Sequence, residues 1–145
     1  MFDFTRFLEN NPNGTMGVSD GSTVTMRFMR YLFNQDNRIF FSTSAKKDLY
    51  RKIRENPHVT FSTHQPDFGK ALSLYGTVEI CEDLPLKRRV FDDSLMIRDI
   101  FLSPDNPDFV LFYIFVETIE TLESNGAVEK YQVLEDHSRV KPAAP

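Results

Sequence analysis

The stretch of sequence that decides the fold is TMRFMRYLFNQDNRIFFSTSAKKDLYRKIRENPHVTF, residues 25–61. Its apolar runs predict a strand over residues 23–33, a turn over NQDN, and a second strand over residues 38–44. A short basic helix follows, with Leu49 and Ile53 as an apolar i, i+4 pair, and Asn56-Pro57 stops it before a further strand begins at His58. This succession of two strands, a helix and a strand is the centre of the predicted fold.

Strand and turn signals continue on both sides of this stretch. A helix is predicted over residues 2–10, and a strand over residues 15–19 is joined to residues 23–33 by Asp20-Gly21, a strong hairpin signal. Downstream, strands are predicted over residues 58–64, 70–81, 109–123 and 127–135, with a helical segment over residues 84–101. Gly76, in the middle of one of these strands, indicates a bulge or a bend. Because hairpins dominate, we expect a mostly β fold with flanking helices, in which an antiparallel sheet forms a closed or half-closed barrel.

Length, charge and cysteine usage limit the classes of protein. The 145 residues suit one domain, predicted over residues 1–136 with a loose tail over residues 137–145. The net charge of −4 argues against a general nucleic-acid binder. Cys81 is the single cysteine, the first residues do not resemble a signal peptide, and no apolar run approaches the roughly 20 residues of a membrane helix. We therefore expect a cytoplasmic protein with neither a nucleic-acid nor a membrane partner.

Two lysines stand where a helix normally disfavours them. Thr43 or Ser44 is the predicted N-cap of the basic helix, which places Lys46 and Lys47 in its first turn. The N-terminal end of a helix carries partial positive charge and unpaired N–H groups, so an anion such as a phosphate would make both lysines favourable there. A solvated basic face is the alternative, because three more basic residues follow on the same helix: Arg51, Lys52 and Arg54.

Arg27 strengthens the prediction of an anion site. Its strand, TMRFMRYLF, is too apolar to suit an exposed edge of a sheet. Alternation places Arg27 on the same face as Thr25 and Met29, and Arg30 on the opposite face. An arginine within such a strand needs a carboxylate or a phosphate as its partner, so a structural ion pair is the alternative to a ligand site.

Taken in order, these elements resemble the pyridoxamine 5′-phosphate oxidase-related, FMN-binding split-barrel family, including its nitroimidazole-resistance-type flavoproteins. In that family, a strand with an arginine precedes a strand ending in an aromatic residue and Ser or Thr, and a helix opening with Ser, Lys or Arg leads to an Asn-Pro-x-Val stop. Here these elements are Arg27, then Phe41-Ser42-Thr43, then Lys46-Lys47, then Asn56-Pro57-His58-Val59. FLENNPNGTMGVSDG, LYGTVEI and DNPDFVLFYIFVETIETLE resemble further parts of the family, so the likeness covers nearly the whole chain.

The resemblance implies an FMN cofactor with its phosphate at the lysines. Lys46 and Lys47 match the pair that holds the phosphate of FMN in the family. Arg27 matches the arginine that reaches the phosphate or the ribityl region. The family is usually homodimeric, with FMN at the subunit interface, so the resemblance also implies a second copy of this chain as a partner.

The resemblance places the remaining parts of the cofactor on two strands. Phe28 and Met29 match positions beside the isoalloxazine of FMN. The strand end formed by Phe41, Ser42 and Thr43 matches residues that contact the flavin and its ribityl chain. With these positions, the family likeness accounts for the whole length of the cofactor.

Three departures separate this chain from the true oxidase of the family. Leu32 stands where the oxidase has a lysine for its phosphorylated substrate, and Ala71 stands where it has a glutamine. The C-terminal DHSRVKPAAP does not match the Arg-x-His segment of the oxidase. We therefore expect an FMN-dependent oxidoreductase that is not a pyridoxamine phosphate oxidase and that acts on a small organic molecule, such as a nitroaromatic or quinone-like compound.

Other functions are compatible with the same barrel. The alternatives are a non-catalytic flavin-binding, carrier or stress protein, and a relative that binds haem or a deazaflavin. For haem, His137 is a poor candidate axial ligand. His64 follows a strand and could face the cofactor, although an ordinary strand-end histidine explains it as well. The histidine, cysteine and acidic residues show no metal-ligand spacing.

Overall fold

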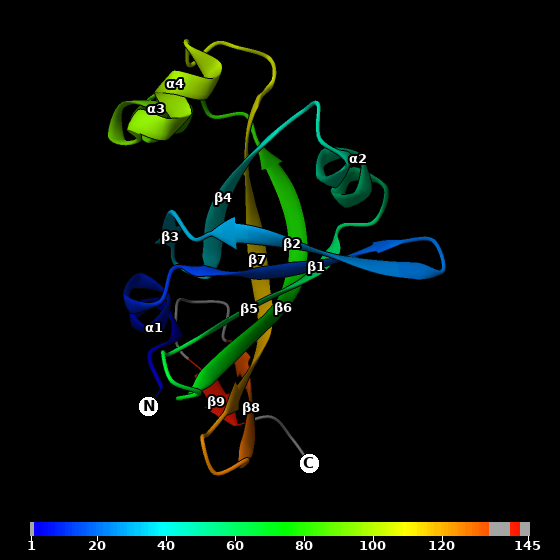
Figure 1. The fold of residues 1–145 in the computed structure, drawn as a ribbon, viewed down its shortest axis with the longest axis vertical. Coiled ribbons are helices and arrows are strands. Elements are labelled where there is room, and N and C mark those ends of the chain that lie inside the picture. The colour runs from blue at the N-terminus through cyan, green and yellow to red at the C-terminus, as the bar shows by residue number, and fades with distance from the viewer. Residues whose placement is uncertain (1, 134–139, 143–145) are drawn as a thin grey trace.

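The computed structural model describes residues 2–133 and 140–142, and this part of the chain is mostly β with flanking helices (Figure 1). The elements in chain order are α1 (Phe4–Asn10), β1 (Asn13–Asp20), β2 (Thr23–Arg30), β3 (Phe33–Gln35), β4 (Arg38–Ser44), α2 (Asp48–Glu55), β5 (His58–His64), β6 (Ala71–Cys81), α3 (Leu84–Asp93), α4 (Leu95–Phe101), β7 (Phe109–Leu122), β8 (Val128–Val133) and β9 (Val140–Pro142). All strand pairs are antiparallel. The predicted fold class is confirmed.

The sheet curls because its two edge strands are consecutive in the sequence. The strand order is β2-β1-β5-β6-β7-β4-β3, with β8 paired to β7 and β9 paired to β8. Only Tyr31 and Leu32 separate β2 from β3, so the two ends of this order must approach each other. The Tyr31 N–H donates to the Pro12 carbonyl at 2.7 Å, and the Leu32 N–H donates to the Phe40 carbonyl at 3.0 Å. The result is a split barrel rather than a flat sheet.

A bulge in β7, opposite Gly76 of β6, bends the longest strand pair of the barrel. Tyr75 pairs with Thr118 and Gly76 pairs with Val116, so Glu117 is left unpaired in the register. A Cβ at Gly76 would lie 2.1 Å from the carbonyl oxygen of Phe115, a distance that no side chain tolerates. The bulge predicted at this glycine is therefore confirmed, and close backbone approach is the reason for the glycine.

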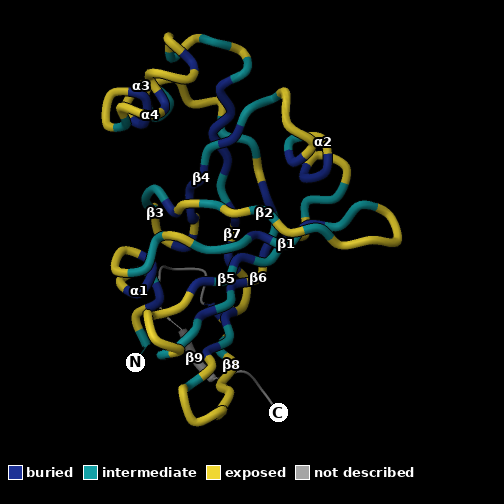
Figure 2. Tube along the Cα trace, in the orientation of Figure 1, coloured by how far each residue is buried: buried dark blue, intermediate teal, exposed yellow. Residues whose placement is uncertain are grey.

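Apolar side chains fill the barrel and a second, smaller core. In the barrel, Phe41 packs against Phe61 and Phe112 with ring centroids 4.8 Å and 5.8 Å apart. The smaller core joins α3 and α4 to the ends of β4 and β7 through residues such as Phe101 and Phe109. Figure 2 shows β7 buried along most of its length, as its apolar sequence predicts, whereas β2 alternates between intermediate and exposed positions.

Three predicted segments differ from the structure. The strand predicted over residues 23–33 ends at Arg30, because the chain there crosses to the other edge of the sheet. The helical segment predicted over residues 84–101 is two helices, since Ser94 ends α3 and caps α4 by accepting a hydrogen bond from the Ile97 N–H at 3.2 Å. Of the tail predicted as loose, residues 137–139 and 143–145 lie outside the described residues, but Val140–Pro142 is a strand because it pairs with β8.

Candidate functional site

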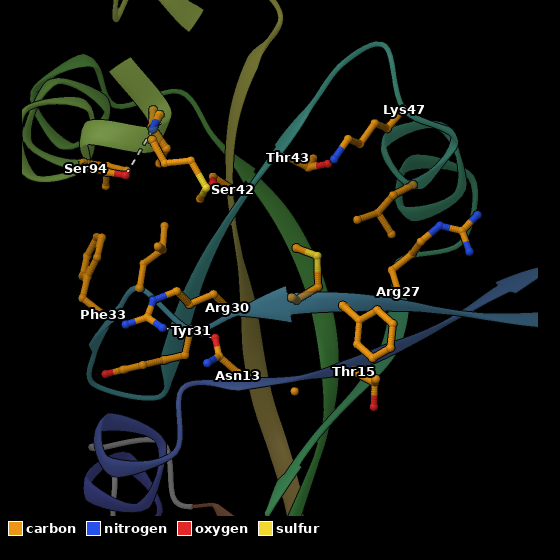
Figure 3. A pocket seen from close by; sticks show the side chains of 18 of the residues that line it. Asn13, Thr15, Arg27, Arg30, Tyr31, Phe33, Ser42, Thr43, Lys47 and Ser94 are labelled. Carbon is orange, nitrogen blue, oxygen red and sulfur yellow. Dashed lines mark hydrogen bonds between the residues drawn. The ribbon is translucent and has the colours of Figure 1, made fainter. Parts of the chain in front are cut away.

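A cavity of about 990 Å³ lies where the split in the barrel meets the helices. It is bounded by the start of β1, the second half of β2 with the crossing to β3, the ends of β4 and β5, the start of α2, and one face of the α3–α4 pair. In Figure 3, the side chains that line the cavity lie on both sides of β4, with Lys47 at one end and Phe33 and Tyr31 at the other. The cavity is therefore built from segments far apart in the sequence.

The helix that carries the two lysines begins later than the sequence predicts. The Ser44 hydroxyl accepts a hydrogen bond from the Lys46 N–H at 3.2 Å, and the Ser44 carbonyl accepts one from the Lys47 N–H at 3.0 Å. These bonds form a turn, so α2 starts only at Asp48, and Lys47 is its N-cap without a side-chain capping bond. The predicted N-cap at Thr43 or Ser44 is wrong, because the serine stabilises this turn instead of the helix.

The structure separates the two lysines. Lys47 lines the cavity, and in Figure 3 its side chain extends toward Thr43 at the end of β4. The Lys46 side chain is 80% exposed, and its Nζ lies 3.4 Å from Asp108 Oδ2. Of the predicted pair, only Lys47 lines the cavity.

Arg27 also lines the cavity, but its environment is more open than the sequence predicts. The expectation that β2 is not an exposed edge is wrong for the single chain, because β2 is the terminal strand of the sheet and Arg27 is only half-buried. Its Nη1 donates to the Met26 carbonyl at 2.9 Å, and within the described residues no carboxylate forms an ion pair with it. A structural ion pair, the alternative explanation, is therefore absent from this part of the chain.

The other predicted contact residues divide between cavity and core. Phe28, Met29, Ser42 and Thr43 line the cavity, and Met29 also packs against the barrel core. The Phe41 side chain is fully buried in that core and does not face the cavity. The cavity thus has hydroxyl groups and cations at one end and apolar side chains beside them.

The opposite wall of the cavity was not predicted from the sequence. Arg30 donates from Nη1 to Asn13 Oδ1 at 3.1 Å, and the Arg89 guanidinium lies 4.8 Å from the centroid of the Phe33 ring. Arg89 also lies 4.0 Å from the Asp93 carboxylate on the same helix. Arg30 could have been proposed as a site residue from the sequence, since it lies in the same strand as Arg27. Arg89 could not, because nothing local in the sequence shows which face of α3 lines a cavity.

Two titratable side chains complete the lining. Burial, reinforced by the nearby charge of Glu9, raises the pKa of Tyr31 to about 12, and its hydroxyl donates to Asn34 Oδ1 at 2.8 Å. His64 lines the cavity at the end of β5, and its Nδ1 lies 2.6 Å from the Gln65 carbonyl oxygen. Tyr31 therefore stays a neutral phenol at neutral pH. The sequence left open whether His64 faces a cofactor or is an ordinary strand-end histidine, and the structure places it in the lining of the cavity.

Metal ligands and membrane-spanning helices are the two other features that would point to a different kind of function. Residues 2–133 and 140–142 contain no group of three or more His, Cys, Asp or Glu side chains that could hold a metal ion. Within the same residues, no helix has both the length and the apolar character needed to cross a membrane. The cavity is the main candidate site in this part of the protein.

Comparisons with known proteins identify relatives of the whole barrel. The family model described as pyridoxamine 5′-phosphate oxidase matches residues 5–123. No curated protein matches the sequence. Among solved structures, a NimC/NimA family protein from Clostridium acetobutylicum is similar with a TM-score of 0.75 and 17% identity, and the match covers 86% of each chain.

Two further solved structures share the fold. A pyridoxamine 5′-phosphate oxidase-related, FMN-binding protein from Nostoc punctiforme has a TM-score of 0.72 and 14% identity, over 92% of this chain and 87% of that one. A haem-binding protein from Mycobacterium smegmatis has a TM-score of 0.71 and 14% identity, over 90% of this chain and 57% of that one. At these identities, the structures establish the shared split-barrel fold.

Proposed function

The chain belongs to the pyridoxamine 5′-phosphate oxidase family, and we propose that it is an FMN-dependent oxidoreductase that acts on a small organic molecule. The main support for this proposal is that the cavity has a cationic part and an apolar part. One end combines Lys47, Arg27 and the Thr43 hydroxyl, and the rest is largely apolar or aromatic. A ligand with an anionic end and a flat ring matches this division.

The residues present fit FMN. Cations and hydroxyl groups are the partners that phosphate prefers, and Lys47 and Arg27 reach the same cavity from different elements. A volume of about 990 Å³ is at the upper end for small-molecule sites, which typically measure about 300–1,000 Å³, so a substrate could share the space. When bound, FMN supplies the transfer of a hydride or of electrons. The chain would bind the phosphate, orient the ring and limit access of water.

We further propose that a second copy of the chain covers β2 and closes the cavity. Val24, Met26 and Phe28 point to the outer side of β2 and are 72%, 56% and 91% exposed. Phe28 lines the cavity, so a partner seated on this face would lie at its mouth. A smaller groove of about 490 Å³ on the outer side of β1, β2, β5 and β6 shares Thr15 and Ser62 with the cavity, which makes the two surfaces continuous.

The substrate half of the true oxidase is not reproduced, so the proposal excludes vitamin synthesis. Leu32 lines the cavity as an apolar side chain where the oxidase of the resemblance has a lysine. The proposed substrate is therefore a small organic electron acceptor or donor, of which nitroaromatic and quinone-like molecules are the first to assay.

Lys47 provides the decisive test of the phosphate site. Riboflavin lacks the phosphate of FMN, so Lys47→Met should weaken FMN binding and leave riboflavin binding nearly unchanged. One charge-assisted hydrogen bond is worth about 1.5–3 kcal/mol, which predicts a loss of roughly tenfold to a hundredfold for FMN. Equal losses for both ligands would refute the assignment. Lys46→Met, measured in parallel, would show whether Lys46 contributes to phosphate binding despite its contact with Asp108.

Spectra of the purified protein separate the remaining functions. Flavin absorption bands agree with the proposal, whereas a Soret band would favour haem, for which the Mycobacterium smegmatis neighbour is the supporting observation. Turnover of a nitroaromatic or quinone substrate with NAD(P)H as electron donor would identify an enzyme. Bound flavin without turnover over a panel of acceptors would favour a flavin carrier or stress protein.

A further inference from the structure

We propose that Lys52 is a positioning residue that fixes the distance between Arg27 and Lys47, and so sets the affinity of the cavity for a phosphate. This inference rests on the proposed function. The sequence suggested that Lys52 belongs to a solvated basic face with Arg51 and Arg54, but the structure contradicts this for one of the three. Lys52 is only 5% exposed, whereas Arg51 and Arg54 are exposed.

Lys52 connects α2 to both arms of the β1–β2 hairpin. Its Nζ lies 3.2 Å from the Thr25 hydroxyl on β2 and 3.9 Å from Asp20 Oδ2 at the end of β1. The same Asp20 oxygen lies 3.4 Å from Arg51 Nη2. Two neighbouring side chains of α2 therefore hold this hairpin, and Lys52 is the one that reaches β2 itself.

The contact with Thr25 matters because of what lies beside it. Thr25 and Arg27 are two residues apart on a strand, so their side chains share a face. Lys47 directly precedes the first residue of the helix that carries Lys52. Through the hydrogen bond to Thr25, Lys52 joins the element that bears one cation of the cavity to the element that bears the other.

The sheet alone does not fix β2 against α2. β2 is the terminal strand of the sheet and pairs only with β1 among the described strands. Its hairpin extends past α2 in Figure 1, with its turn at Gly21 and Ser22. Side-chain contacts from α2 must therefore set the position of β2 on that side, and Lys52 supplies a buried one.

Burying the charged side chain of Lys52 costs more free energy than burying an apolar side chain of similar size would. A buried ammonium loses its hydration, and its carboxylate partner here lies 3.9 Å away. Methionine has a similar length and no charge, and Asp20 would keep its contact with Arg51. If Lys52 served only to pack the helix, Lys52→Met would change the binding of all ligands equally. A positioning role instead predicts a loss that is specific for the phosphate.

The test measures dissociation constants for FMN and for riboflavin, by quenching of flavin fluorescence, with the purified apo-protein. Lys52→Met should weaken FMN by about tenfold, the partial loss of one charge-assisted hydrogen bond, with riboflavin nearly unchanged. Arg54→Met is the matched control on the same helix, and it should change neither the FMN nor the riboflavin dissociation constant. Thr25→Val removes the same contact from the strand side and should reproduce the loss if Lys52→Met does not fold.

A double-mutant cycle shows whether Lys52 acts through Arg27. In an Arg27→Met background, Lys52→Met should have little further effect on FMN affinity, because the residue that it positions is gone. Lys52→Arg should recover part of the loss, since it can still donate to Thr25. An undiminished effect in the Arg27→Met background would overturn the inference, as would equal weakening of FMN and riboflavin.

The variant Lys47→Met separates failure of this inference from failure of the proposed function. If Lys47→Met lowers the preference for FMN over riboflavin but neither Lys52→Met nor Thr25→Val does so, the inference on Lys52 is refuted and the phosphate site stands. If Lys47→Met leaves the preference unchanged, the phosphate site itself is refuted, and the role of Lys52 with it.

Discussion

Replacing Phe28 with serine should dissociate the proposed homodimer. Phe28 is 91% exposed in the single chain, although it lies in a strand whose outer face also carries Val24 and Met26. Exposed apolar side chains that adjoin one another typically mark an interface. Phe68 is equally exposed at 94%, but it lies in the turn between β5 and β6, away from this face. The chain therefore offers a matched control, Phe68→Ser.

The expected magnitude follows from the exposure of Phe28. Nearly all of its side chain is available for burial, and burying a phenylalanine stabilises a complex by about 1.5–3 kcal/mol. An interface with two-fold symmetry contains each contact twice, so Phe28→Ser should weaken the dimer by about 3–6 kcal/mol. This corresponds to a dissociation constant raised by roughly a hundredfold to ten-thousandfold. Phe68→Ser should leave the constant within about a factor of three.

Sedimentation equilibrium over a concentration series, with FMN present, measures the dissociation constant directly. Wild-type protein should be dimeric at micromolar concentration, Phe28→Ser largely monomeric, and Phe68→Ser dimeric. The absorption spectrum of each sample reports whether the flavin remains bound, because a partner at the mouth of the cavity should help to retain it. A wild-type protein that binds FMN as a monomer would refute the reasoning, and so would identical constants for the two serine variants.

Two further predictions concern the barrel itself. The raised pKa of Tyr31, about 12 against an ordinary value of 10.0, means that the folded state favours the neutral phenol. The resulting stabilisation is complete below about pH 10 and is lost as the pH rises toward about 12, so wild-type protein should lose on the order of 1–2 kcal/mol more than Tyr31→Phe over this range in urea unfolding. Gly76→Ala would place a Cβ 2.1 Å from the Phe115 carbonyl oxygen and 2.8 Å from Ile114 Cγ2. It should lower the free energy of unfolding by about 2–3 kcal/mol, and an unchanged melting temperature would show that the bulge relaxes freely.

Local sequence patterns predicted the strands well because the information they need is local. The bounds of β4 and β5 agree with the prediction, since apolar alternation and the Asn56-Pro57 stop define them within a few residues. The start of α2 was wrong because two local structures compete for Ser44. A serine can cap a helix or stabilise a turn, and here its hydroxyl bonds to the Lys46 N–H and delays the helix.

Properties of the whole sheet were harder to predict. The apolar character of β2 predicts that its face is covered, but the sequence does not show which part of the molecule, or which partner, would cover it. In the single chain β2 is an edge strand, and Phe28 is exposed. Strand order depends on contacts between residues far apart, and so does the wall that Arg89 and Phe33 contribute to the cavity. The alternation of apolar and polar residues along a single strand indicates neither the strand order nor this wall of the cavity.

The remaining departures from local rules lie on two neighbouring elements, α2 and β2. A lysine occupies the N-cap of α2 where Ser, Thr, Asp or Asn would be favourable, an ammonium is buried at Lys52, and Phe28 is left in contact with solvent. Each of these is unfavourable for a chain that only has to fold. Sequences keep such unfavourable choices mainly at functional sites. An anion beside Lys47 and a partner over Phe28 would relieve two of them, and the third lies between α2 and β2, the elements that carry Lys47 and Arg27. Binding of an anion and of a second copy at these two elements would therefore account for features that packing alone leaves unexplained.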